Sequence, residues 1–81
     1  MNVINVTSEN SGGSTFDSAS VEHIYICPGN EIRKEQELLE LATDKSVIII
    51  SSPIAGIVDE ICVVKGQKVS ADTLLCILRE F

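Results

Sequence analysis

The sequence predicts an all-β domain in which two antiparallel sheets enclose one core of Ile, Val and Leu side chains. Short apolar runs alternate with clusters of Gly, Pro, Asn and Ser, a pattern typical of strands joined by turns. The chain has one Tyr, two Phe and no Trp. Aliphatic side chains must therefore fill the core, which favours a thin β structure over a helical bundle. An internal repeat indicates a symmetric arrangement of the sheets.

The repeat consists of two half-repeats, residues 21–41 and 58–78, which align without a gap. Their glycines align at predicted turns and their apolar residues at predicted inward positions. We expect two similar half-motifs packed about a pseudo-twofold axis, as one domain over residues 1–81. The hairpin near residue 45 would then lie at one end and both termini at the other. The identical pairs are Val21/Val58, Ile24/Ile61, Gly29/Gly66, Leu38/Leu75 and Leu41/Leu78.

The remaining strands follow from the local pattern of apolar and polar residues. Two apolar runs, residues 38–42 and 47–50, surround a short polar break, which predicts a β-hairpin. The other expected strands are residues 3–7, 21–26, 57–64 and 74–78, and the expected turns and connections are residues 27–30, 31–36, 65–68 and 69–72.

Two details refine the first half of the chain. Alternation in residues 21–26 places Ile24 and Ile26 toward the core. Pro28 and Gly29 predict a type II turn, because proline presets its own φ and glycine supplies a positive φ. The Ser- and Gly-rich segment 8–20 predicts a surface loop, which Phe16 is expected to pin to the body.

The hairpin tip carries the candidate site, Thr43, Asp44, Lys45 and Ser46. Thr43, Asp44 and Ser46 are turn formers, because their short side chains can bond the nearby backbone. Lys45 is the only Lys or Arg between residues 35 and 64. The ordinary interpretation is a solvated lysine that keeps the turn soluble. The alternative is an isolated amine that an enzyme can acylate without disturbing the core.

Composition excludes several classes of function. The chain has 12 acidic and 6 basic residues and a net charge of −6, so it lacks the basic face that nucleic-acid binding requires. The charge suits an electropositive partner instead. No run approaches the roughly 18 apolar residues of a membrane span, and the N-terminus does not resemble a signal peptide.

The sequence also lacks the patterns of a catalytic or metal site. Cys27, Cys62 and Cys76 have no CxxC spacing, so we expect neither a disulfide framework nor zinc. We interpret all three as small apolar residues of strands in a reducing compartment. His23, the single histidine, is expected on the surface of a strand. We therefore expect no catalytic residues and no metal ligands, and a domain that is not an enzyme by itself.

Three motifs, in this order, resemble the lipoyl domain of 2-oxo acid dehydrogenase acyltransferases. They are Thr-Asp-Lys-Ser at residues 43–46, Ser-Pro-Ile-Ala-Gly-Ile-Val at residues 52–58 and Val-Lys-Gly-Gln-Lys-Val at residues 64–69. The family pattern is roughly E-T-D-K-A, then S-P-x-A-G-x-V, then V-x-x-G-D-x-V. The resemblance covers residues 21–80, and the ordered combination of motifs is highly specific.

The resemblance implies a flattened β-barrel or sandwich of two four-stranded sheets, the barrel-sandwich hybrid. It implies that Lys45 carries lipoate in amide linkage, that Thr43, Asp44 and Ser46 form the turn around it, and that segment 8–20 lies beside the hairpin. The implied partners are a lipoate ligase or lipoyl transferase, a thiamine-dependent 2-oxo acid decarboxylase, an acyltransferase catalytic domain and dihydrolipoyl dehydrogenase. The domain itself is expected to be a monomer and a piece of a longer acyltransferase, in the bacterial cytoplasm or the mitochondrial matrix.

The chain departs from the family pattern near the lysine and at both turns. Ala42 stands where the family often has Glu, and Ser46 replaces the usual Ala. Asn30 and Gln67 replace the Asp that follows each turn glycine. Residues 47 and 49, Val and Ile, fall at outward positions where the family is often polar.

Three alternatives stand beside the lipoyl carrier. A biotinyl carrier has the same fold, but its motif places Met on both sides of the lysine, where this chain has Asp44 and Ser46. An unmodified adaptor domain usually lacks the lysine. A glycine-cleavage carrier would require a longer chain. Among the 2-oxo acid complexes, the run at residues 52–58 favours the pyruvate complex.

Overall fold

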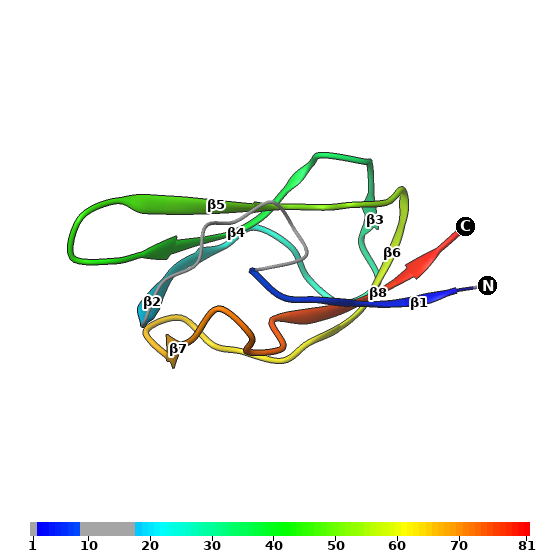
Figure 1. Cartoon of the computed structure of the whole chain (residues 1–81). Coiled ribbons are helices and arrows are strands. Elements are labelled where there is room, and N and C mark those ends of the chain that lie inside the picture. Colours follow the sequence, from blue (N-terminus) through cyan, green and yellow to red (C-terminus); the bar gives the residue numbers. More distant parts are fainter. Residues whose placement is uncertain (1, 9–17) are drawn as a thin grey trace.

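The computed structural model describes residues 2–8 and 18–81. Within them, eight strands form two four-stranded antiparallel sheets that face each other but do not close into a true barrel (Figure 1). One sheet has the strand order β1-β8-β6-β3 and the other β5-β4-β2-β7. The all-β prediction is confirmed. The strands are β1 (Val3–Val6), β2 (Ala19–Ile24), β3 (Glu31–Ile32), β4 (Glu37–Ala42), β5 (Val47–Ser51), β6 (Gly56–Ile61), β7 (Lys68–Val69) and β8 (Cys76–Glu80).

The pseudo-twofold symmetry expected from the repeat is present in the backbone hydrogen bonds. The N–H of Gly29 donates to the carbonyl oxygen of Val58 at 2.8 Å, and the N–H of Gly66 donates to that of Val21 at 2.7 Å. Each half therefore inserts its turn against the strand of the other half. Because each sheet contains strands of both halves, neither half can form its sheet alone.

The two turns are built in the same way despite their different residues. Gly29 and Gly66 have φ of 92° and 89°, a conformation that favours glycine. The side-chain oxygen of Asn30 accepts a hydrogen bond from the N–H of Cys27 at 2.9 Å, and that of Gln67 accepts one from Val64 at 3.1 Å. The amides that replace the family's Asp thus still hold the turns.

The core lies between the two sheets and is aliphatic, as the composition predicts. Six Leu and Ile side chains are completely buried, and burying each contributes about 1.5–3 kcal/mol to the free energy of unfolding. Residues 39, 41 and 78 belong to the central strands β4 and β8 and face the core. The six are Leu38, Leu39, Leu41, Ile50, Leu75 and Leu78.

A β-bulge changes the predicted orientation of residues 21–26. The register of β2 against β4 shifts between Val21 and His23, so the alternation is interrupted there. Val21 and Ile26 are buried, whereas Ile24 is only half-buried at the edge of the core. Ile24 and Ile26 thus both face the core, as expected, but Ile24 packs against its edge. The equivalent bulge in β6, between Val58 and Glu60, preserves the symmetry.

The expected cysteine environments are correct for one residue of three. Cys76 is buried in the core, and burial, with a smaller contribution from Cys62, raises the pKa of its thiol to about 12. Cys27 and Cys62 are exposed, because one precedes the first turn and the other follows the end of β6. Exposed His23 agrees with the sequence prediction.

Some boundaries also differ from the sequence prediction. Two short strands, β3 and β7, lie in segments that we expected to be a polar turn and a connection. Ile32 and Val69 are their buried residues, and each pairs with a strand of the opposite half. Within the expected loop 8–20, residues 19 and 20 belong to β2, and residues 9–17, with Phe16, lie outside the described residues.

The molecule is elongated, with extents of 36 × 19 × 17 Å. The β4–β5 hairpin lies at one end and the two termini lie together at the other, as the symmetry argument predicts (Figure 1). In the described residues no helix is long and apolar enough to cross a membrane.

Gly56 provides a test of the close packing between β6 and β8. A Cβ atom at this position would collide with the carbonyl oxygen of Arg79. We expect Gly56→Ala to lower the free energy of unfolding by about 1–3 kcal/mol, measured by urea titration. Gly29→Asn is the control, because the space around Gly29 is open and Asn tolerates a positive φ. A larger loss for Gly29→Asn than for Gly56→Ala would contradict the packing described here.

Thiol alkylation tests the three cysteine environments. Only the thiolate reacts, so the buried Cys76 with its raised pKa should resist iodoacetamide at pH 8. We expect peptide mapping to show alkylation of Cys27 and Cys62 in the folded chain and of all three cysteines in urea. Alkylation of Cys76 in the folded chain at the rate of Cys27 would show that the core is not packed as described.

Candidate functional site

The turn at the hairpin tip is organised by Thr43. Its N–H donates to the carbonyl oxygen of Ser46 at 2.8 Å, which closes the hairpin. Its Oγ1 donates to the same carbonyl at 3.1 Å and accepts from the N–H groups of Lys45 and Ser46 at 3.2 and 3.1 Å. One threonine thus fixes the backbone of the turn. This agrees with the prediction that Thr43 is a turn former whose side chain bonds the nearby backbone.

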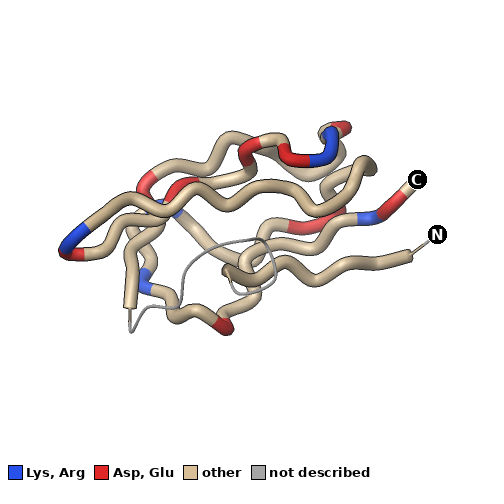
Figure 2. The backbone as a smooth tube through the Cα atoms, turned by 45° about the horizontal axis from the view of Figure 1, so that its top comes forward, with Lys and Arg blue, Asp and Glu red and all other residues tan. Residues whose placement is uncertain are grey.

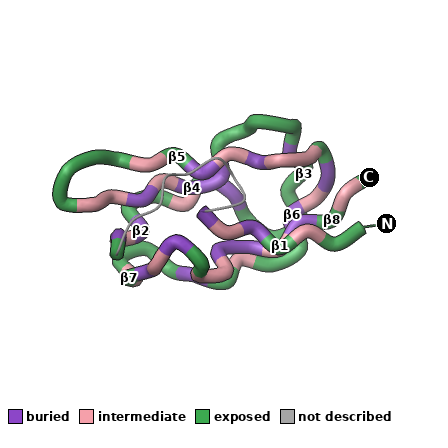
Figure 3. The backbone as a smooth tube through the Cα atoms, viewed as in Figure 1, coloured by how far each residue is buried: buried purple, intermediate pink, exposed green. Residues whose placement is uncertain are grey.

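Lys45 lies at the most exposed point of this turn. Asp44, Lys45 and Ser46 are all exposed, and the green tip of the hairpin in Figure 3 extends beyond the rest of the molecule. Figure 2 shows one basic and one acidic position side by side there. Within residues 2–8 and 18–81, neither Lys45 nor Asp44 forms an ion pair. The amine of Lys45 is therefore exposed and makes no described ion pair.

The base of the hairpin is anchored in the core, whereas its tip is exposed. β4 is a central strand that pairs with both β5 and β2. Leu39 and Leu41 of β4 and Ile50 of β5 are completely buried. The core therefore fixes the position of the turn, while the long side chain of Lys45 can move in solvent.

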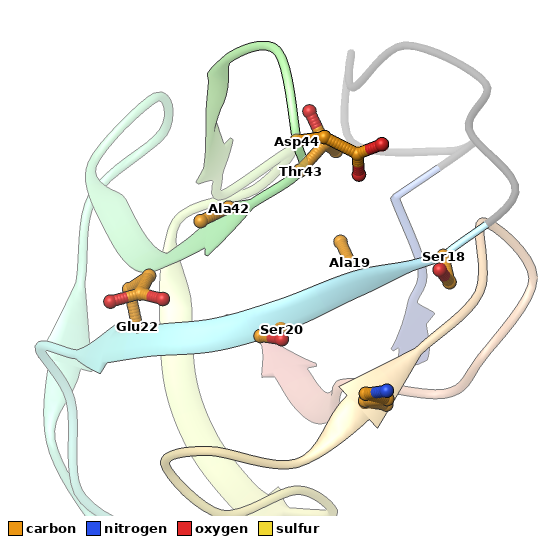
Figure 4. A pocket seen from close by; sticks show the side chains of 8 residues that line it. Ser18, Ala19, Ser20, Glu22, Ala42, Thr43 and Asp44 are labelled. Atoms are coloured by element: carbon orange, nitrogen blue, oxygen red, sulfur yellow. The ribbon is translucent and has the colours of Figure 1, made fainter.

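A shallow hollow lies beside the hairpin tip (Figure 4). It has a volume of about 300 Å³ and a mainly polar lining. Ala42, Thr43 and Asp44 form one side, and β2 crosses its floor. Sequence reasoning missed this hollow, because the register of β2 against β4 and β7 brings its residues together. The other lining residues are Ser18, Ala19, Ser20, Glu22 and Lys68.

A small cluster farther along the same sheet contains His23. Its ring stacks on Tyr25 with 5.8 Å between ring centroids, and its Nε2 lies 3.7 Å from the Oε2 of Glu40. His23 and Glu40 lie on β2 and β4, and Tyr25 directly follows β2, so the three residues make a local contact. In the described part of the chain, no group of three or more His, Cys, Asp or Glu side chains is placed to hold a metal ion.

Comparison with known proteins identifies the family. Residues 5–78 match the model of the biotin–lipoyl family, which is described as "Biotin-requiring enzyme". The match includes the hairpin, both turns and the strands of both half-repeats.

Three curated relatives are dihydrolipoyllysine-residue acetyltransferase components of pyruvate dehydrogenase complexes. The protein from Haemophilus influenzae is 36% identical over 59 residues, which are 73% of this chain and 10% of that protein. The protein from Buchnera aphidicola is 33% identical over 64 residues, which are 79% of this chain and 16% of that protein. The protein from Cupriavidus necator is 33% identical over 63 residues, which are 78% of this chain and 11% of that protein. The chain thus spans only a small part of these relatives.

Solved structures share the fold at lower identity. The lipoyl domain of the 2-oxoglutarate dehydrogenase complex from Azotobacter vinelandii superimposes with a TM-score of 0.71 at 22% identity and covers 99% of this chain and 98% of that domain. A region of a single-chain long-chain acyl-CoA carboxylase superimposes with a TM-score of 0.81 at 15% identity, over 98% of this chain and 7% of that protein. With its two-sheet fold and the exposed lysine at its hairpin tip, the chain belongs to the biotin–lipoyl attachment family.

Proposed function

We propose that this chain is the lipoyl carrier domain of a 2-oxo acid dehydrogenase complex, with lipoate in amide linkage to Lys45. The observation that carries the proposal is the position of Lys45, exposed and without an ion pair among the described residues, at a hairpin tip that Thr43 holds. The names of the three relatives favour the pyruvate complex.

The geometry suits a carrier for a physical reason. An amide bond between the Nζ of Lys45 and the carboxyl group of lipoate removes one positive charge from an exposed turn. It breaks no described ion pair and no described hydrogen bond, because the turn is held by Thr43 and by backbone groups. Lipoate supplies the dithiolane chemistry, and the chain supplies the position from which a long arm reaches successive active sites. Tethering raises the effective concentration of the acyl group at each site.

The proposed partners follow from this role. A lipoate ligase or lipoyl transferase would modify Lys45. A thiamine-dependent 2-oxo acid decarboxylase, an acyltransferase catalytic domain and dihydrolipoyl dehydrogenase would then use the arm in turn. The domain holds and presents the arm and is not itself the catalyst. The cytoplasm of a bacterium or the mitochondrial matrix is the compartment in which we place it.

Lipoate is favoured over biotin by the residues around the lysine. The biotinyl motif has Met on both sides, whereas Asp44 and Ser46 flank Lys45 in this chain. An adaptor role without modification is the second candidate, because Ala42 and Ser46 depart from the lipoyl pattern at the tip. Both alternatives give a distinct result in the experiment below.

Intact mass spectrometry tests the attachment. The chain is co-expressed with a lipoate ligase in medium containing lipoate, and in parallel with a biotin ligase in medium containing biotin. We expect one lipoyl group on the wild-type chain, none on Lys45→Ala and no biotin on either. Lys65→Ala is the matched control, because Lys65 is also an exposed lysine in a turn, and it should gain the lipoyl group.

The other outcomes are equally informative. Addition of biotin would replace the lipoyl proposal with a biotinyl carrier. A folded wild-type chain that gains neither group would favour the adaptor. Modification of both wild type and Lys45→Ala would assign the site to another lysine.

A further inference from the structure

The outer edge of β5 differs from an ordinary sheet edge. Within the described residues, β5 pairs only with β4, so one side of the strand has no neighbour. Val47 and Ile49 point outward from this strand and are 58% and 38% exposed. Their neighbours Ile48 and Ile50 pack toward the core. β5 therefore has an apolar outer face next to a free edge.

The free backbone groups of this edge belong to the same two residues. Thr43 and Ser46 form a hydrogen-bonded pair at the tip. Pairs alternate along an antiparallel ladder, so Val47 opposite Ala42 and Ile49 opposite Glu40 are the non-hydrogen-bonded pairs. The N–H and C=O groups of Val47 and Ile49 consequently point away from β4. The residues with exposed side chains thus also present free hydrogen-bonding groups.

The sequence of this edge lacks two of the usual protections against strand pairing, charge and proline, and the one bulge of the β4–β5 ladder lies on β4, between Glu37 and Leu39. Proteins normally place charges, prolines or bulges on exposed edges to prevent association. From residue 46 to residue 52 the chain is Ser-Val-Ile-Ile-Ile-Ser-Ser, without a charge or a proline. An apolar edge without charge or proline, immediately after the turn that carries Lys45, favours a surface that a partner covers.

The charge beside β5 indicates the chemistry of that partner. Glu40 pairs with Ile49 across the ladder and lies on the same outer face. Adjacent strands lie about 4.8 Å apart, so a strand added to β5 would lie about 10 Å from β4. An Arg or Lys side chain on that strand covers part of this distance and the side chain of Glu40 covers the rest, so the basic stem would lie over Ile49 with the two charged heads close together.

The position of the β5 edge beside Lys45 indicates which partner covers it. Along the strand, Val47 lies about 7 Å and Ile49 about 13 Å from Lys45, at about 3.3 Å per residue. A partner that holds β5 therefore brings the amine of Lys45 to a fixed place on its own surface. An enzyme that acts on Lys45 needs this arrangement.

We propose that the free edge and outer face of β5 dock the enzyme that acylates Lys45, which adds an extended strand with Arg or Lys side chains to β5. The identity of this partner rests on the proposed attachment of lipoate, whereas the edge and its charge are features of the structure itself. Docking through a strand combines backbone hydrogen bonds with side-chain pockets.

The pseudo-twofold symmetry provides a matched control. β1 is the edge strand of the other sheet, and Val3 pairs with Arg79 as Val47 pairs with Ala42. Val3 has the same exposed fraction as Val47, 58%, but lies at the end of the molecule with the termini. A lysine at either position meets a similar backbone environment, and only one is next to Lys45.

The experiment measures modification and binding separately. Initial rates of lipoyl transfer by a lipoate ligase give kcat and KM for the wild-type chain, Val47→Lys, Glu40→Gln and Val3→Lys. We expect Val47→Lys to raise KM about tenfold with kcat nearly unchanged, the loss that one central interface side chain commonly causes. Glu40→Gln should raise KM and weaken its dependence on salt. Val3→Lys should match the wild type.

Binding is read from the backbone amide signals of the 15N-labelled chain during titration with the ligase, without lipoate or ATP. We expect shifts in residues 47–51 and none in β1. Equal KM values for Val47→Lys and Val3→Lys, or shifts confined to residues 43–46, would overturn the docking proposal while the attachment stands. Shifts in β5 without transfer would support docking and overturn the attachment. Neither binding nor transfer would overturn both.

Discussion

The fold depends on a reciprocal exchange of hydrogen bonds between the two halves of the chain. The turn glycine of each half donates its N–H to the strand of the other half, Gly29 to Val58 and Gly66 to Val21. In return, the N–H groups of Val58 and Val21 donate to the carbonyl oxygens of Asn30 and Gln67 at 2.9 Å each. This exchange ties each half to the other around a thin aliphatic core. It also explains why positive φ is required at both glycines.

The position of Lys45 is a consequence of that core. Both strands of the hairpin turn one face to the core, and the turn extends past the buried Leu41 and its partly buried partner Ile48. The core therefore determines where the turn lies, while Thr43 determines its shape. Neither task requires Lys45 itself. A residue with no structural task can be chemically modified without a loss of stability, which is the physical basis for a carrier site.

The sequence predicts the features that depend on local pattern and misses those that depend on register. The hairpin, both glycine turns and the aliphatic core follow from turn formers and β-branched runs, and the repeat predicts the symmetry. The bulge after Val21 is not visible in the pattern, and it leaves Ile24 only half-buried. The exposure of Cys27 and Cys62 depends on where β2 and β6 end. The hollow beside Asp44 can be predicted only when the register of three strands, β2, β4 and β7, is known. Lys45 stays a prediction of its contiguous motif, and the structure adds that it is exposed in the turn of the hairpin.

The symmetry of the strands extends to the two ends of the molecule. At the hairpin, the N–H of Thr43 donates to Ser46 at 2.8 Å, and at the opposite end the N–H of Glu80 donates to Asn2 at 2.9 Å. The paired termini therefore occupy the place of a second hairpin from which the connecting turn is absent. The fold is compatible with circular permutation: a chain joined between residues 81 and 2 and opened between residues 44 and 45 would keep every strand pair. In such a permutant the new termini would emerge where Lys45 now lies, and a turn with the sequence of residues 43–46 could be installed at the opposite end of the molecule.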